Sequence, residues 1–288
     1  MTEINAANAG TLSLGDQTFN RLGYGAMQLP GKGVWGPSAD PQNAVAVLRR
    51  AAELGVNFID TADAYGPFTA NLLIKEAFAP YNGNYQNLTI STKVGFTRQG
   101  PNEWTVVGRP AYLRQEVELN LRSLGLETLD LVFLHRIDPK VPLGDQVGEL
   151  AKMQKEGKIK HIGLSQVSVA QIEEAGQYAK IEAVQNLYNV TNRKDEAVLN
   201  YCEAHHILFV PWFPLATGAL AKPGSVLDNL AKKHQASPAQ IALAWLLKRS
   251  PVMLPIPGTA NQDHLAQNVA ATNIALTDED VQAINALQ

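Results

Sequence analysis

Four side chains of this sequence combine the proton chemistry of an acid, an amine, a phenol and an imidazole: Asp60, Lys93, Tyr65 and His135. Asp60, Lys93 and His135 each stand at or near the end of a short apolar run, and Tyr65 follows Asp60 by five residues. A phenol has a pKa near 10, and a neighbouring ammonium lowers it by stabilising the phenolate.

These residue types fit one reaction in particular. Lys93 would supply the ammonium beside Tyr65, Asp60 would keep it charged, and an imidazole would orient a carbonyl oxygen. Together, the four side chains would stabilise and protonate the alkoxide that forms when hydride reaches a carbonyl carbon. Lys93 could instead form a Schiff base in a lyase or isomerase, an alternative that the partners Asp60, Tyr65 and His135 argue against.

The apolar runs that carry these residues recur regularly. Stretches of helical periodicity separate eight β-rich segments, at 23–28, 57–62, 88–94, 129–135, 161–166, 183–189, 207–213 and 252–258. Eight β-α alternations over about 250 residues are typical of a (β/α)8 (TIM) barrel, an α/β fold. The carboxyl ends of the strands would meet at one mouth, which would bring the candidate residues together.

The rest of the chain fits a single domain over residues 1–288. The segment before residue 22 predicts a β-hairpin around Gly15-Asp16 that closes the bottom of the barrel, which spans 23–260. Helices at 261–288 follow, the last one opened by Thr277 and Asp280 as a capping box. A doubly wound dinucleotide fold is the competitor, but segment 22–27 lacks the third glycine of G-x-G-x-x-G.

Composition limits the classes of partner. A net charge of −3 offers no broad positive field for nucleic acid, and no apolar run is long enough for a membrane helix. Because the N-terminus lacks a signal pattern and Cys202 is the single cysteine, we expect a cytoplasmic protein without disulfides. No Cys/His spacing suggests a metal site, and no sequence feature identifies a protein partner.

The stretch 55–66, GVNFIDTADAYG, resembles the principal signature of the aldo-keto reductases. Shorter matches extend over nearly the whole chain, at 91–93, 134–135, 162–165, 184–186, 212–215 and 256–259. The resemblance implies a (β/α)8 barrel that binds an extended nicotinamide dinucleotide without a Rossmann domain. It also implies that Tyr65 is the general acid, that Lys93 and Asp60 tune it, and that His135 orients the substrate.

The same resemblance implies a set of cofactor contacts. Ser165 and Gln185 would bind the carboxamide and Trp212 would stack on the nicotinamide ring. Gln166 replaces the usual Asn and Phe213 a common Ser, which alters the details of these contacts. The remaining expected cofactor residues are Gly25, Ala26, Met27, Asp60, Leu215, Thr217, Gly218, Ile256, Gly258, Thr259, His264, Gln267 and Asn268.

The segment expected at the 2′-phosphate contains no lysine or arginine. His264 stands at the position of a family arginine, and Asp263 would repel a phosphate. The helix that begins near Asn261 would present free backbone amides to an anion. We therefore expect NADP(H) to be favoured, NAD(H) to be possible, and discrimination between them to be weak.

The substrate should be a small carbonyl compound held among aromatic side chains. Loops after the strands place Trp35, Phe68, Phe96 and Trp104 near Tyr65 and His135. Segments 20–29, 33–37 and 65–67 resemble the bacterial branch that includes pyridoxal reductases, so pyridoxal is the sharpest candidate. The resemblance leaves one non-catalytic alternative, a dinucleotide-binding sensor subunit like the potassium-channel β subunits of this family.

Overall fold

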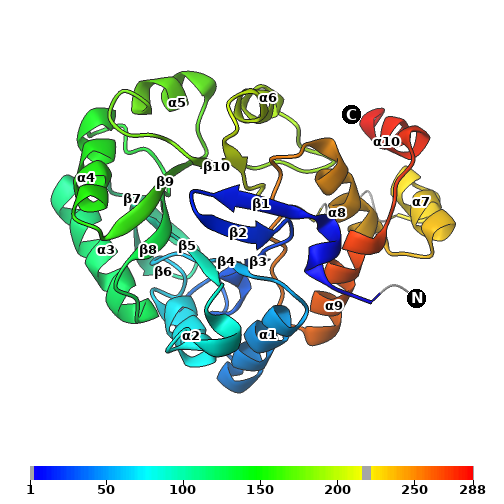
Figure 1. Ribbon diagram of the computed structural model, residues 1–288, viewed down its shortest axis with the longest axis horizontal. Coiled ribbons are helices and arrows are strands. Elements are labelled where there is room, and N and C mark those ends of the chain that lie inside the picture. Colours follow the sequence, from blue (N-terminus) through cyan, green and yellow to red (C-terminus); the bar gives the residue numbers. More distant parts are fainter. Residues whose placement is uncertain (1–2, 216–221, 288) are drawn as a thin grey trace.

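A curled parallel sheet ringed by helices forms the body of the protein (Figure 1). The computed structural model describes residues 3–215 and 222–287. The sheet has the strand order β11-β10-β9-β8-β5-β4-β3, and every neighbouring pair is parallel. Its strands are β3 (Tyr24–Gly25), β4 (Phe58–Asp60), β5 (Thr89–Val94), β8 (Leu129–Leu134), β9 (Ile159–Ser165), β10 (Ala183–Gln185) and β11 (Leu208–Phe209). The expected α/β barrel class is confirmed.

The eighth expected strand, 252–258, is an extended segment and not a regular strand. Leu254 N donates to Phe209 O and Gly23 N donates to Pro255 O, both at 2.9 Å, so the segment bridges β11 to the chain just before β3. Pro255 and Pro257 have no N–H to donate, which prevents a continuous ladder there. Among the described residues, the ring therefore closes through two backbone hydrogen bonds to Phe209 of β11 and one from Gly23.

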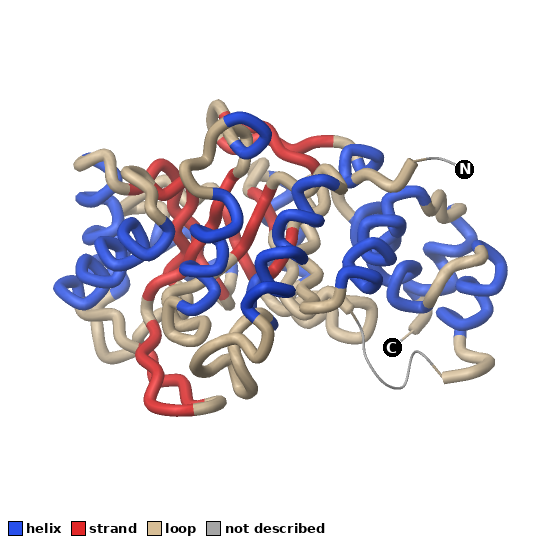
Figure 2. Tube along the Cα trace, turned by 90° about the horizontal axis from the view of Figure 1, so that it is seen from below, coloured by secondary structure: helices blue, strands red, loops and turns tan. Residues whose placement is uncertain are grey.

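Helices cover the outer face of the sheet, as Figure 2 shows for helices in blue around strands in red. Local signals fix their ends: Asp40 caps the first helix by accepting from Asn43 N, and Pro41 suits its first turn. The helices are α1 (Pro41–Glu53), α2 (Thr69–Phe78), α3 (Pro110–Leu124), α4 (Leu143–Lys155), α5 (Val169–Ala175), α6 (Glu196–Ala204), α7 (Val226–His234), α8 (Pro238–Arg249), α9 (Gln262–Ala270) and α10 (Asp278–Asn285), with short 3-10 turns at Ala6–Ala9, Ala26–Gln28, Gly83–Tyr85 and Ala271–Asn273. Thr277 and Asp280 form the expected capping box at the start of α10. Within the described ranges, no helix combines the length and apolar character needed to cross a membrane.

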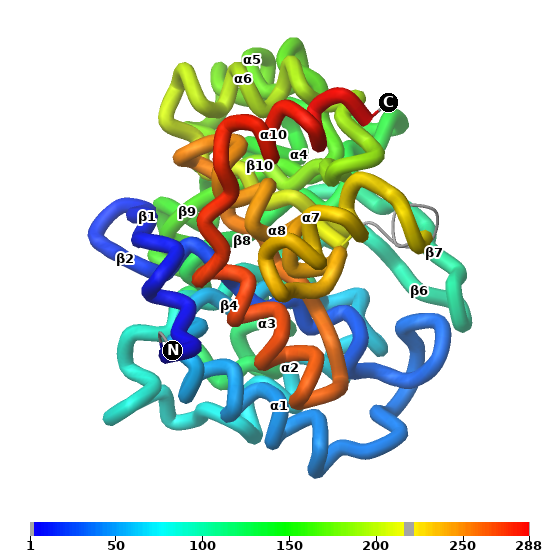
Figure 3. The backbone as a smooth tube through the Cα atoms, turned by 90° about the vertical axis from the view of Figure 1, so that its right-hand side faces the viewer, coloured from blue at the N-terminus to red at the C-terminus, as the bar shows by residue number. Residues whose placement is uncertain are grey.

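Two hairpins lie on opposite sides of the molecule (Figure 3). The expected N-terminal hairpin, β1 (Thr11–Leu14) and β2 (Gln17–Asn20), crosses the barrel end where the strands begin (Figure 1). Phe19 is fully buried there, and its ring lies 4.9 Å from that of Phe58. The second hairpin, β6 (Phe96–Gly100) and β7 (Glu103–Val106), follows β5 at the other end.

The interior of the barrel divides into an apolar end and a polar end. Side chains alternate along a strand, so Phe58 and Asp60 of β4 both point inward, as do Phe133 and His135 at the end of β8. The apolar members form one buried cluster of Leu14, Phe19, Phe58, Leu131, Phe133, Ala183, Leu208, Val210, Leu254 and Ile256. The polar members lie beyond this cluster, at the carboxyl ends of the strands.

Candidate active site

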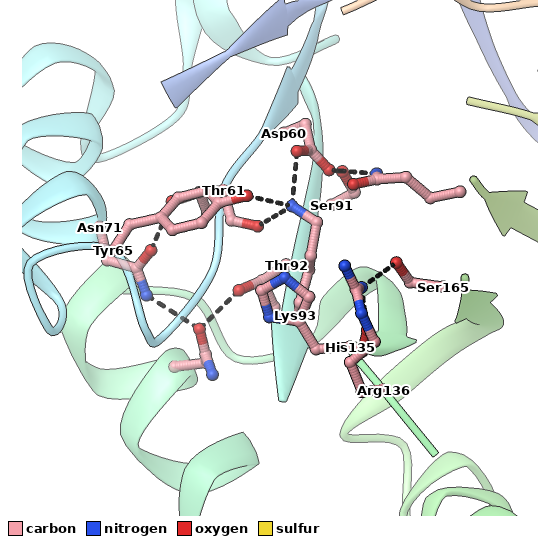
Figure 4. Close-up of polar contacts among 12 residues, drawn as sticks. Asp60, Thr61, Tyr65, Asn71, Ser91, Thr92, Lys93, His135, Arg136 and Ser165 are labelled. Carbon is pink, nitrogen blue, oxygen red and sulfur yellow. Dashed lines mark hydrogen bonds and ion pairs between the residues drawn. The ribbon is translucent and has the colours of Figure 1, made fainter. Parts of the chain in front are cut away.

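Lys93 is the centre of a buried hydrogen-bonded group at the carboxyl end of the barrel (Figure 4). Its Nζ atom donates to Asp60 Oδ2 at 2.6 Å, to Thr61 O at 2.8 Å and to Tyr65 Oη at 3.1 Å. All three ammonium protons therefore have an acceptor. The other oxygen of Asp60 accepts from Ser91 Oγ at 2.8 Å and from Gln185 Nε2 at 3.0 Å. The ammonium of Lys93 and both oxygens of Asp60 therefore have hydrogen-bond partners, and residues of β4, β5 and β10 fix their positions.

The loop after β4 presents Tyr65 to this group. Tyr65 N donates to Ala62 O, and Tyr65 O accepts from Ala70 N of α2, so the loop turns directly into the helix. Gly66 has φ +97°, and a Cβ there would lie 2.4 Å from Thr69, so a larger residue would strain the turn. This local geometry fixes the phenol against Lys93.

A chain of buried polar side chains supports the loop from outside the barrel (Figure 4). Thr61 Oγ1 donates to Asn71 Oδ1 at 2.9 Å, and Asn71 Nδ2 donates to Asn120 Oδ1 at 2.8 Å. Thr92 Oγ1 donates to the same Asn120 oxygen at 2.6 Å. Since Thr61 and Thr92 flank the catalytic candidates in sequence, this network links α2 and α3 to the position of Lys93.

Burial decides the ionisation of the tyrosine. It raises the pKa of Tyr65, and Lys93 offsets that rise only in part, so the net pKa lies above its ordinary value. The expectation that Lys93 would bring this pKa below 10 is therefore wrong, because desolvation outweighs the ammonium. Burial lowers the pKa of Lys93, but Asp60 and Tyr65 more than compensate, and the net pKa is raised. At neutral pH the site holds an ammonium and a protonated phenol.

His135 is a neutral imidazole in this setting. Burial and then the charges of Lys93 and Arg136 hold its pKa well below the ordinary value. Its Nδ1 atom is buried without a partner among the described residues, which leaves Nε2 to meet a substrate. The ring centroid lies 6.1 Å from that of Tyr65 and 4.7 Å from that of Phe96, both edge-on.

Asp63 is a second buried carboxyl group in the same loop as Tyr65. It is 2% exposed, and neither carboxyl oxygen accepts a hydrogen bond from a described side chain. Burial and then the charge of Glu116 raise the pKa of Asp63 well above its ordinary value, and the charge of Lys93 offsets that rise only in part. Among the described residues, Asp60 is the carboxylate that forms the direct ion pair with Lys93.

A cavity of about 450 Å³ opens over these residues at the barrel mouth. It is lined by Gly25, Met27, Gln28, Asp60, Tyr65, Phe96, Trp104, His135, Arg136, Ser165, Gln185, Trp212, Phe213, Pro214, Leu215, Ile256, Pro257 and Gly258. Fourteen of these eighteen were expected from the sequence. Gln28, Arg136, Pro214 and Pro257 were missed, although Arg136 directly follows His135.

Ser165, Gln185 and Trp212 are arranged as a nicotinamide site would require. Ser165 can donate its hydroxyl proton. Gln185 donates from its nitrogen to Asp60, and its amide oxygen accepts no hydrogen bond from the described part of the chain. A carboxamide needs one donor and one acceptor of this kind. Trp212 Nε1 donates to Gln166 Oε1 at 3.1 Å, which fixes the indole ring. The residues present therefore fit the cofactor that the sequence implies.

Gln166 contributes to this site only through its neighbours. Its backbone is left-handed, with φ +55°, and its Oε1 also accepts from Leu187 N at 3.1 Å. Its nitrogen donates to Asp195. Gln166 is not among the residues that line the cavity, so its contact with the carboxamide stays a prediction.

Backbone alone forms the wall where two glycines meet. A Cβ on Gly25 would lie 2.7 Å from Ile256 O, and one on Gly258 would lie 2.4 Å from Gly25 O. Only glycine permits so close an approach. Neighbouring Ala26 is buried and does not reach the cavity.

The start of α9 differs from its expected role. Asn261 Oδ1 accepts from Asp263 N at 2.8 Å and from His264 N at 3.0 Å, and Thr259 Oγ1 accepts from Asn261 N at 3.1 Å. The expectation of free amides there is wrong for these residues, because the asparagine cap already pairs them. His264 and Gln267 are exposed, Thr259 and Asn268 are buried, and none of the four lines the cavity. Thr217 and Gly218 lie outside the described residues.

Two of the four loop aromatics reach the cavity. Phe96 and Trp104 line it, whereas Trp35 and Phe68 do not. The guanidinium of Arg98 lies 3.6 Å from the centroid of the Trp104 ring and 5.7 Å from that of Trp35. Arg98 also donates to the carbonyl oxygens of Gly33, Val34 and Ala64 at 2.7 to 2.9 Å. Trp35 thus packs behind the wall and helps to clamp the β6–β7 hairpin beside the Tyr65 loop.

Fold and site together define a (β/α)8-barrel oxidoreductase with a tyrosine, a lysine, an aspartate and a histidine around one cavity. The chain belongs to the aldo/keto reductase family, whose sequence model matches residues 21–288. It is therefore an NAD(P)H-dependent enzyme that interconverts carbonyl and CH–OH groups, and the Schiff-base alternative falls away.

Several known proteins are similar to the chain over most of its length. An uncharacterised oxidoreductase of Schizosaccharomyces pombe is 53% identical over 96% of this chain and 89% of its own. Pyridoxine 4-dehydrogenase of Escherichia coli is 43% identical over 97% of this chain and 99% of its own. An aldo-keto reductase from Klebsiella pneumoniae, solved in complex with NADPH, superimposes with a TM-score of 0.80 at 27% identity, covering 93% of this chain and 90% of that one.

Proposed function

We propose that this protein reduces pyridoxal to pyridoxine, with NADPH as the favoured reductant. The observation that carries the proposal is a cavity in which two flat aromatic walls, Phe96 and Trp104, lie beside the phenol of Tyr65. Such walls suit a flat aromatic aldehyde. The E. coli relative, named for pyridoxine oxidation at position 4, supports the same substrate. A cytoplasmic setting belongs to the proposal and agrees with a single, buried thiol at Cys202.

The proposed roles follow from the hydrogen bonds of the site. Tyr65 donates its proton to the substrate oxygen, and Lys93, 3.1 Å from the phenol oxygen, stabilises the phenolate that results. Asp60 keeps Lys93 charged. Neutral His135 donates a hydrogen bond from Nε2 and so orients the carbonyl. When bound, the nicotinamide dinucleotide supplies the hydride.

Ser165, Gln185 and Trp212 would hold the nicotinamide, and His264 is the nearest substitute for a phosphate-binding arginine. An imidazole binds a dianion less firmly than a permanent cation does. Since Asn261 already pairs two amides of α9, we expect NADPH to be preferred over NADH by less than about tenfold.

The direct experiment follows NADPH absorbance with pyridoxal, 4-nitrobenzaldehyde and an aliphatic aldehyde, and repeats the pyridoxal series with NADH. We expect kcat/KM to be highest for pyridoxal. If the enzyme reduced the other aldehydes but not pyridoxal, pyridoxal would be refuted as its substrate. Dinucleotide binding without turnover of any carbonyl would instead favour the regulatory subunit.

The pH dependence of the reaction tests the ionisation of His135. We expect kcat/KM for reduction to stay level from about pH 5.5 to 8, because burial keeps the imidazole neutral and the phenol protonated throughout. The rate should fall only at higher pH, where the phenol loses its proton. An inflection near pH 6.5 that disappears in His135→Gln would contradict a neutral histidine.

A further inference from the structure

Arg136 lines the cavity and carries a positive charge that no carboxylate of the described residues neutralises. Its Nη1 atom donates to Ser165 Oγ at 3.0 Å and to the carbonyl oxygen of His135 at 2.5 Å (Figure 4). Both acceptors are neutral. Among the described residues, Nε and Nη2 have no acceptor, so three of the five N–H donors are available.

The charge balance of the cavity makes this arginine unusual. Asp60 is the only acidic residue among those that line the cavity, and Lys93, Ser91 and Gln185 already occupy its oxygens. Burial lowers the pKa of Arg136, but a guanidinium keeps its proton at neutral pH. The wall therefore offers one net positive charge to whatever the cavity binds.

The position of the guanidinium is fixed beside the reacting groups. Its central carbon lies 5.7 Å from the ring centroid of Phe96 and 5.9 Å from that of Trp212, the aromatic walls proposed for substrate and nicotinamide. The charge of Arg136 also acts on both Tyr65 and His135, lowering the pKa of each. The guanidinium group of Arg136 is thus held between the proton donor and the nicotinamide site.

The bond to Ser165 does not compete with cofactor binding. Ser165 Oγ accepts from Arg136 and keeps its own proton, which it can still donate to a carboxamide oxygen. The available donors of Arg136 are therefore left for the substrate.

We propose that Arg136 is a specificity-determining residue that binds an anionic oxygen, a carboxylate or a phenolate, close to the reacting carbonyl of the substrate. The inference rests on the proposed carbonyl reduction and names its substrate class. A planar guanidinium forms charge-assisted hydrogen bonds with such oxygens, which a neutral cavity wall cannot. Pyridoxal belongs to this class, because an acidic ring hydroxyl stands next to its aldehyde.

The test compares matched pairs of aldehydes in wild type and Arg136→Met. One pair is 2-carboxybenzaldehyde and its methyl ester, and the other is salicylaldehyde and 2-methoxybenzaldehyde, so the two arms separate carboxylate from phenolate. We expect wild type to prefer the acid of at least one pair. In Arg136→Met the ratio of acid to neutral kcat/KM should fall by about 10-fold to 150-fold, the loss of a charge-assisted hydrogen bond. Arg136→Lys should retain part of the preference.

Arg193→Met is the matched control, since Arg193 also places a guanidinium over an aromatic ring and donates to backbone carbonyls but does not line the cavity, and its loss should leave the ratio unchanged. If Arg136→Met lowered kcat/KM equally for the acidic and the neutral aldehyde of each pair, the proposal would be overturned. Arg136 would then only position Ser165. No preference in wild type for either acid would overturn it as well.

A second readout separates this proposal from the proposed function. Binding of 2-carboxybenzaldehyde in the presence of NADP⁺, where no hydride is available, can be followed by tryptophan fluorescence, because Trp104 and Trp212 line the cavity. We expect Kd to rise by about 10-fold or more in Arg136→Met. If wild type turns over no aldehyde, but Kd still rises in Arg136→Met, the proposed aldehyde reduction fails and anion binding at Arg136 stands. An unchanged Kd would overturn the role of Arg136.

Discussion

Replacement of Tyr65 by phenylalanine is expected to lower kcat for aldehyde reduction by about 10²-fold to 10⁴-fold, the usual contribution of a positioned general acid. The substitution removes one oxygen, the atom that lies 3.1 Å from Lys93 Nζ, and leaves the ring in its buried place. KM for the aldehyde should change much less, since the aromatic walls remain. Steady-state rates with saturating NADPH measure both quantities.

Tyr81→Phe is the matched control. The phenol of Tyr81, like that of Tyr65, takes part in a hydrogen bond, here as the donor to Leu124 O at 2.6 Å, but it does not line the cavity. Its kcat should stay within about threefold of wild type, as expected for a change away from the reacting atoms. If Tyr65→Phe kept more than about a tenth of the wild-type rate, another group would have to supply the proton.

The parts of the site that the sequence predicts are those that strand geometry dictates. Asp60, Lys93 and His135 stand at the ends of strands, and inward-facing side chains at the carboxyl ends of parallel strands must converge. Tyr65 follows from the short turn that joins β4 to α2, whose length leaves it little freedom. Hydrophobic periodicity and capping signals are local, so they also give the barrel and most of its helices.

What the sequence does not predict depends on how side chains from distant segments meet. The cap of Asn261 pairs the amides that a free helix start would offer, and Arg136 lines the cavity near the rings of Phe96 and Trp212, which come from distant segments. The net pKa of Tyr65 depends on the depth of burial, which the neighbouring Lys93 alone does not reveal. Prolines at 255 and 257 interrupt an apolar run that otherwise reads as a strand.

Replacement of Lys93 by methionine should damage both activity and stability. The change leaves Asp60 as a buried charge, 2% exposed, with only Ser91 and Gln185 as hydrogen-bond donors. Loss of one partner of a buried ion pair costs about 3–5 kcal/mol, so the free energy of unfolding should fall by that order. Without the ammonium, the phenolate of Tyr65 also loses its main stabilising charge, and kcat should fall by about 10²-fold or more. Denaturant unfolding and steady-state kinetics measure the two effects.

The double variant Asp60→Asn/Lys93→Met separates these effects. It removes both charges, and a neutral amide keeps hydrogen bonding near Ser91 and Gln185, so much of the lost free energy of unfolding should return. The rate should not recover, because the charge beside Tyr65 is still missing. If the double variant regained activity together with stability, Lys93 would serve the fold and not the proton transfer. If stability stayed low while Asp60→Asn alone was stable, the packing of the Lys93 side chain, and not its charge, would account for the loss.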